Sequence, residues 1–164
     1  MRELLFRAKA INREKGEHRT NYNNGDWVYG LISKPYNDCF PDLPAEMINE
    51  EGVSGIEVDY KTICQYTGIT DRNGEKIFEG DVVVVERVGR ELCLVIFDED
   101  KACFQLCSKF DIYDMSDFNC DTDIKVVGNI CDTPEWIKIA FYNGIFRIDN
   151  ERIKKCCVED KNGI

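Results

Sequence analysis

The chain has 164 residues, of which 43% are hydrophobic and 32% charged, and its formal net charge is −10. This balance excludes a disordered chain and is typical of a soluble globular protein. No apolar run approaches the roughly 20 residues of a membrane helix. The first residues, "MRELLFRAKAINREKGE", lack the apolar core of a signal peptide, so we expect a cytoplasmic protein.

The first third of the chain contains short strands separated by turn signals. Glu3–Ala10 and Trp27–Ser33 are predicted strands, and a polar segment with an Asn-Gly turn signal connects them. Residues 44–52, "PAEMINEEG", are predicted to form one short helix, because proline suits a helix start and glycine a helix end. Strand character resumes over residues 56–69, where apolar and polar residues alternate.

The segment "QYTGITDRNGEKIFEGDVVVVE", residues 65–86, combines two turn signals with an apolar run. Asn73-Gly74 predicts a tight hairpin or a bulged turn. Asp71 is expected to cap this turn by accepting hydrogen bonds from backbone N–H groups two residues on. Gly68, Gly74 and Gly80 are expected to permit turns or close backbone approaches. Turn chemistry therefore favours a scaffold role for this block.

The remaining elements predict a mainly β fold. The β-branched run "VVVVERV" begins a strand, residues 91–110 form a hairpin around Asp98-Glu99-Asp100, and Ile124–Ile130 is a further strand. An acidic, irregular link is predicted over residues 111–123. About seven or eight short strands favour a small barrel-like or half-closed antiparallel sheet with one or two short helices, and a β-rich α+β fold is the alternative.

The chain is expected to contain one β-rich domain, residues 1–137, and an appendage, residues 138–164. The appendage has a second Asn-Gly hairpin candidate, "IAFYNGIFRI", followed by a basic and helical tail. We expect it to pack on the domain or on a second subunit.

No motif supports catalysis or metal binding. The nine cysteines are irregularly spaced and contain no C-x-x-C pair, and His18 is the only histidine, so no metal and no cofactor are expected. Asp71-x-Asn73-x-Glu75 resembles the start of a calcium loop, but Val82 stands at position twelve, where the bidentate Glu belongs. No catalytic constellation is found, and an enzyme is not expected.

Charge and aromatic residues suggest a binding role. Residues 81–135 carry thirteen Asp/Glu against five Lys/Arg. This balance disfavours direct nucleic-acid binding and suits either solubility or a basic protein partner. The aromatic residues Trp27, Tyr29, Tyr60, Tyr66 and Phe78 are expected to fill the core, with a recognition surface as the alternative. Trp27 and Tyr29 share one face of their strand.

Four segments carry a family resemblance: Phe6-Arg7-Ala8, Trp27-Val28-Tyr29-Gly30, "DYKTICQYTGITDRNGEKIFEGDVV" and "VVGNICDTPEW". In this order they resemble the YopX family of phage and prophage proteins, over roughly residues 3 to 137. The resemblance implies a β-rich fold and an origin in a phage or an integrated element, and it implies no catalytic residue. With the expected cytoplasmic location, this predicts a protein of the bacterial host's cytoplasm. The motif residues, structural or binding, are Trp27, Tyr29, Gly30, Tyr66, Thr67, Gly68, Asp71, Asn73, Gly74, Glu79, Gly80, Asp81, Gly128 and Asn129.

The sequence therefore predicts a non-enzymatic accessory protein that binds a host or phage protein and self-associates as a homo-oligomer. The alternative is a nucleic-acid-associated module of phage replication or regulation. It requires a basic face, either from Arg2, Arg7, Lys9 and Arg13 or from Arg147, Arg152, Lys154 and Lys155. No membrane partner is expected.

Overall fold

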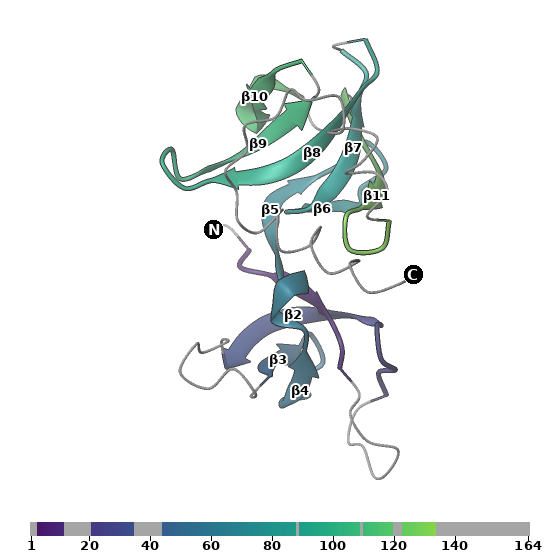
Figure 1. The fold of residues 1–164 in the computed structure, drawn as a ribbon, viewed down its shortest axis with the longest axis vertical. Helices are drawn as coiled ribbons and strands as arrows, with labels where there is room; N and C mark the ends of the chain where they lie inside the picture. Colours follow the sequence, from purple (N-terminus) through teal and green to yellow (C-terminus); the bar gives the residue numbers. More distant parts are fainter. Residues whose placement is uncertain are drawn as a thin grey trace, which may run out of the picture. The chain divides into compact units, whose positions relative to one another are not determined.

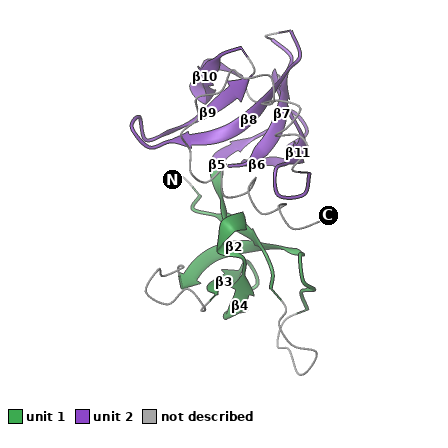
Figure 2. Cartoon of the chain, in the orientation of Figure 1, with its two compact units in different colours: residues 1–66 green, residues 67–164 purple. Residues whose placement is uncertain are grey.

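The computed structural model describes residues 3–11, 21–34, 44–87, 89–108, 110–119 and 123–133. These residues form short antiparallel strands and two 3₁₀ turns, which Figure 1 shows in chain order. The chain divides into two compact units, Met1–Tyr66 and Thr67–Ile164 (Figure 2). The prediction of a mainly β fold is confirmed.

Unit 1 is built around an antiparallel sheet with the strand order β4-β3-β2-β1, and β5 follows β1. Its elements are β1 (Phe6–Lys9), β2 (Trp27–Lys34), β3 (Ala45–Asn49), β4 (Ile56–Val58), η1 (Tyr60–Thr62) and β5 (Cys64–Thr70), which continues into unit 2. A single antiparallel bridge between Ala10 and Val58 joins the end of β1 to β4. The sheet therefore curls back on itself without forming a second full ladder.

One face of this sheet forms the core of unit 1, because a strand's period of two places alternate residues on the same side. Its buried residues are Ala8, Ala10, Val28, Ala45, Met47, Ile56 and Val58. Gly30 lies where β2 and β3 approach closely. A Cβ atom at this position would overlap the carbonyl oxygen of Ile48 and lie 2.8 Å from the Cα of Asn49.

The predicted helix over residues 44–52 is wrong, because this segment contains the strand β3. Ala45, Met47 and Asn49 are buried while Glu46 and Ile48 are partly exposed, which is the period of a strand and not of a helix. The proline and glycine that bracket the segment stop a strand as readily as they bracket a helix. The alternation of five residues was the stronger signal.

Unit 2 contains a five-stranded antiparallel sheet with the order β10-β9-β8-β7-β11. The elements of unit 2 are β6 (Lys76–Phe78), β7 (Asp81–Val85), β8 (Glu91–Asp98), β9 (Cys103–Ser108), β10 (Ile112–Asp114), η2 (Met115–Asp117) and β11 (Ile124–Asn129). Of these, β6 pairs with β5 and is not part of the five-stranded sheet. The predicted hairpin of residues 91–110 is confirmed, since β8 pairs with β9 in register from Cys93↔Ser108 to Asp98↔Cys103. The acidic segment that was predicted to be an irregular link contains the short strand β10.

Both faces of the five-stranded sheet carry buried apolar residues. The larger cluster comprises Ile77, Val83, Val85, Cys93, Val95, Phe104, Leu106, Met115, Phe118 and Ile124. A smaller cluster on the opposite face comprises Val82, Leu94, Ile96, Cys107 and Ile130. Double-sided burial explains why β7 and β8 are nearly continuous apolar runs, without the alternation of a half-exposed strand.

Neither sheet closes into a barrel within the described residues, since each strand order has two ends. The predicted boundary between residues 137 and 138, and the appendage itself, lie outside the described residues and stay predictions. The division between Tyr66 and Thr67 was not predicted from the sequence. Across the described ranges, no helix has the length and hydropathy that crossing a membrane requires.

Candidate functional site

Asp71 holds the turn between β5 and β6 against the outer edge of β11. Its carboxylate accepts hydrogen bonds from the backbone N–H groups of Asn73 (2.7 Å), Glu75 (3.0 Å) and Val126 (3.0 Å). The first two bonds form the predicted cap of the turn. The third spans 55 residues of sequence and satisfies a donor on an edge strand, next to the irregular pairing between Val126 and Gly128.

The Asp71 carboxylate is buried, with 2% of the residue exposed. Burial by itself raises the pKa of Asp71, but the N–H donors of Val126, Glu75 and Asn73 outweigh it and hold the pKa below its usual value. The carboxylate is therefore ionised at neutral pH, and its oxygens face N–H donors. This arrangement is a structural clamp and does not resemble a calcium loop, whose carboxylates point at the cation.

Asp81 and Asn129 form a second buried clamp. Asp81 accepts hydrogen bonds from the N–H of Phe78 (2.7 Å) and from the side-chain amide of Asn129 (3.0 Å). The side-chain oxygen of Asn129 in turn accepts the N–H of Cys131 at 2.7 Å. The two residues thus join the turn before β7 to the end of β11.

The other motif residues of unit 2 also have structural positions. The Thr67 hydroxyl donates to the carbonyl oxygen of Ile77 at 2.8 Å, which ties β5 to β6. Gly74 and Gly80 have φ angles of 81° and 79°, in the region that favours glycine, as predicted. Glu79 lies in the turn before β7, Gly68 in β5 and Gly128 at the irregular pairing in β11.

A surface of aromatic, apolar and basic side chains lies on β1 and β2 in unit 1. Trp27, Tyr29 and Leu31 share the face of β2 that points away from the core, and Tyr29 is 37% and Leu31 47% exposed. Lys9 Nζ lies 4.1 Å and Arg7 Cζ 4.7 Å from the centre of the Trp27 ring. The register Lys9↔Trp27 and Arg7↔Tyr29 places both cations on this face. We call these five residues the aromatic face.

The sequence-predicted residues therefore separate into two groups. Trp27, Tyr29 and Gly30 lie on β2, and the buried Tyr66 donates its N–H to the carbonyl oxygen of Leu5 at 2.9 Å within unit 1. The others, from Thr67 to Asn129, form the clamps and turns of unit 2. Leu31 was missed as a surface residue, although the spacing of Trp27, Tyr29 and Leu31 at every second position carried the signal.

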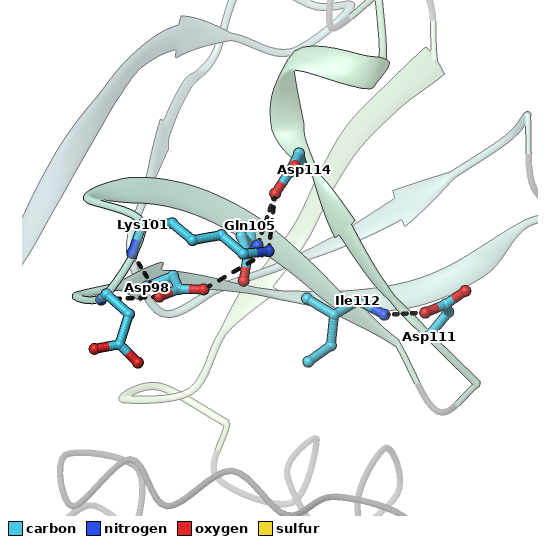
Figure 3. A network of polar contacts seen from close by, with 7 residues as sticks. Asp98, Lys101, Gln105, Asp111, Ile112 and Asp114 are labelled. Atoms are coloured by element: carbon cyan, nitrogen blue, oxygen red, sulfur yellow. Dashed lines mark hydrogen bonds and ion pairs between the residues drawn. The ribbon is translucent and has the colours of Figure 1, made fainter.

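The edge of the sheet at β10 carries a polar network, which Figure 3 shows. The side-chain amide of Gln105 donates to Asp114 at 2.6 Å, and Asp98 accepts the N–H groups of Asp100 and Lys101 at 3.0 and 3.1 Å. Lys101 Nζ lies 4.0 Å from Asp98 and 3.9 Å from Asp114. These contacts fix the positions of two carboxylates on the surface of unit 2.

The buried Cys93 and Cys107 thiols are poorly suited to nucleophilic catalysis. Burial is the main cause that raises the pKa of the Cys93 and Cys107 thiols to about 12, so both are protonated at neutral pH. Among the residues that the structure describes, no group of three or more His, Cys, Asp or Glu is placed to hold a metal ion.

The fold and the contacts define a class: a β-rich protein of two antiparallel units, whose motif residues hold turns against strands. The family model described as YopX protein matches residues 7–138. Since the match covers most of the chain, the protein belongs to the YopX family, as the motif resemblance predicts. A search of curated proteins finds no match.

Proposed function

We propose that this chain is a non-enzymatic accessory protein of a phage or prophage, which acts in the host cytoplasm by binding a host or phage protein through its aromatic face. The observation that carries the proposal is the exposure of Tyr29 and Leu31 beside Trp27, on a strand whose opposite face is core. Tyrosine and tryptophan are the residue types that most often anchor protein interfaces. The motif residues of unit 2 are occupied in turn clamps, which leaves the aromatic face as the better binding candidate.

The burial of Arg7 leaves few accessible cations on this face, which favours a protein ligand over nucleic acid. Arg7 is 7% exposed, so its guanidinium supports Trp27 and presents little surface to a ligand. A Trp ring that contacts two cations is held in place and loses little conformational entropy on binding, which is the advantage of a preorganised anchor.

The test is a pull-down with tagged protein from lysate of the infected or lysogenic host, with and without nuclease and at two salt concentrations. A partner that resists nuclease and salt is then purified and titrated. Tyr29→Ser combined with Leu31→Ser is expected to weaken binding by about 2 kcal/mol or more, roughly thirtyfold. Val127→Ser is the matched control, because Val127 is 38% exposed on unit 2. Equal affinity of both variants, or no retained partner, would contradict the proposal.

A second candidate is a nucleic-acid-associated module, which the contact of Lys9 and Arg7 with Trp27 favours, since single strands bind where bases stack on aromatic rings beside cations. A gel shift with single-stranded DNA at increasing salt tests it. If only one cation contacts the strand, log K is expected to fall with log salt with a slope of about −0.7. A slope several times steeper would mean that several cations contact the strand, and it would support this candidate. No shift at low salt would exclude it.

Self-association is part of the proposal. The predicted appendage, residues 138–164, is the segment expected to pack on a second subunit, so the aromatic face stays available to the partner. Light scattering of the purified chain is expected to give at least a dimer at micromolar concentration, and the Tyr29→Ser/Leu31→Ser variant is expected to keep this state. A strict monomer would contradict this part.

A further inference from the structure

We propose that the β10 edge of unit 2 is a second interaction surface, which docks a basic, extended segment of a partner protein. Two large apolar side chains are exposed there, Phe110 at 70% and Ile112 at 48%. The carboxylates of Asp111 and Asp114 lie at this edge, and that of Asp98, at the end of β8, is linked to Asp114 through Lys101 (Figure 3). This surface, the acidic edge, belongs to unit 2 alone, so the inference is independent of the aromatic face.

The charge of the acidic edge selects the partner. Exposed apolar side chains on an edge strand invite contact with another chain. Here they are flanked by carboxylates, and residues 81–135 carry a net charge of −8 from thirteen Asp/Glu and five Lys/Arg. An acidic segment or nucleic acid would be repelled, whereas a segment with Lys or Arg beside an apolar residue is complementary in both respects.

Lys101 shows where a cation of the partner would lie. Its Nζ lies between Asp98 and Asp114, at 4.0 and 3.9 Å, and its side chain is 59% exposed. Exposed ion pairs at this distance contribute about 0–1 kcal/mol, so a partner's cation displaces Lys101 at little cost. Both carboxylates are already held, Asp114 by Gln105 and Asp98 by the backbone of its loop, which reduces the entropy lost on binding.

The backbone of β10 indicates docking through side chains. Ser108 donates its N–H to the carbonyl oxygen of Asp111 at 2.9 Å, so the backbone of Asp111 faces β9 and that of Ile112 faces the open edge. The N–H of Ile112 already donates to the Asp111 carboxylate at 2.8 Å. Asp111 thus caps the outward donor, and the partner does not extend the sheet at this point.

The spacing on β10 specifies the segment. Ile112 and Asp114 are two residues apart on one face, which is roughly 7 Å in a strand. An extended segment repeats its side chains on one face at the same interval. We therefore expect Lys or Arg at one position and an apolar residue two positions away, so that the cation meets Asp114 and the apolar side chain meets Ile112.

The test uses the full chain and a fluorescein-labelled peptide of sequence Lys-Ser-Ile-Ser-Lys, with Glu-Ser-Ile-Ser-Glu as the charge-reversed control, and measures fluorescence anisotropy at low salt. Lys101→Met is expected to strengthen binding of the Lys peptide by about threefold, because it removes the competing cation. Lys125→Met removes the same charge from the opposite edge strand, β11, and is expected to change binding much less. A misfolded Lys101→Met variant would bind the peptide less tightly, so a gain in affinity reports on the removed charge.

Two further variants test the contacts separately. Asp114→Asn keeps an acceptor for Gln105 and is expected to weaken binding by about fivefold, whereas Glu50→Gln in unit 1 is its matched control. Ile112→Ser is expected to weaken binding without changing its salt dependence. Equal effects of Lys101→Met and Lys125→Met, equal affinity for the two peptides, or no binding of the Lys peptide at about 1 mM would overturn the proposal.

Discussion

Replacing Asp71 by alanine is expected to lower the free energy of unfolding of unit 2 by about 2–6 kcal/mol. The change removes an acceptor from the N–H groups of Asn73, Glu75 and Val126. Val126 N–H loses its partner at a half-buried edge, which costs about 1–3 kcal/mol, and the two turn donors cost about 0.5–1.5 kcal/mol each because water reaches them. The contact between the turn and β11 therefore accounts for about half of the loss.

The assay is urea unfolding followed by the labelling rate of the buried Cys93 and Cys107 thiols, which report on unit 2. Asp26→Ala is the control, because Asp26 caps an exposed turn in unit 1 through Asn23, at 2.7 Å to its N–H, and contacts no distant strand in that role. It is expected to cost about 1 kcal/mol or less. An Asp71→Ala protein within about 0.5 kcal/mol of the natural chain would refute the clamp.

The pH dependence of stability gives an independent check on Asp71. Because its pKa is lowered in the folded protein, the ionised carboxylate stabilises the fold at pH values above the ordinary Asp pKa. This contribution is lost as the pH falls through the folded pKa. The natural chain is therefore expected to lose more stability between about pH 5 and pH 2 than Asp71→Asn does. Parallel stability curves would show that folding does not lower the pKa of Asp71.

Three further predictions concern local structure. Gly30→Ala is expected to destabilise unit 1 by about 3 kcal/mol because the new Cβ overlaps β3, whereas Gly25→Ala, which has open space around it, should cost about 1 kcal/mol in thermal unfolding. Alanine at Asp81 and at Asn129 should give a coupling energy of about 1–2 kcal/mol in a double-mutant cycle, and strict additivity would argue against their contact. Because its thiol pKa is raised to about 12, Cys93 should resist alkylation at pH 8 until the chain unfolds, as mass spectrometry would detect.

Local chemistry made much of this fold predictable from sequence. The Asp71 cap followed from an Asx turn, and the shared face of Trp27 and Tyr29 followed from the period of a strand. The hairpin of residues 91–110 followed from two apolar runs around an acidic loop. In each case the residues that decide the structure lie within a few positions of one another.

Long-range pairing was not predictable in the same way. Nothing in the sequence connects Asp71 with Val126, or Asp81 with Asn129, because these partners are 55 and 48 residues apart. The division of the strands into two sheets depends on such pairings, so one half-closed sheet was predicted where two open sheets form. The helix predicted over residues 44–52 is wrong because it was inferred from the proline and glycine at its ends. The alternating burial of Ala45, Met47 and Asn49 is that of a strand.

Hydrogen exchange of the chain, alone and in the captured complex, distinguishes an aromatic face that binds a protein partner from a motif block, residues 65–81, that does so. New protection is expected in β1 and β2, with the amides of residues 67–81 equally protected in both states. Protection confined to residues 67–81, with β1 and β2 unchanged, would contradict this expectation.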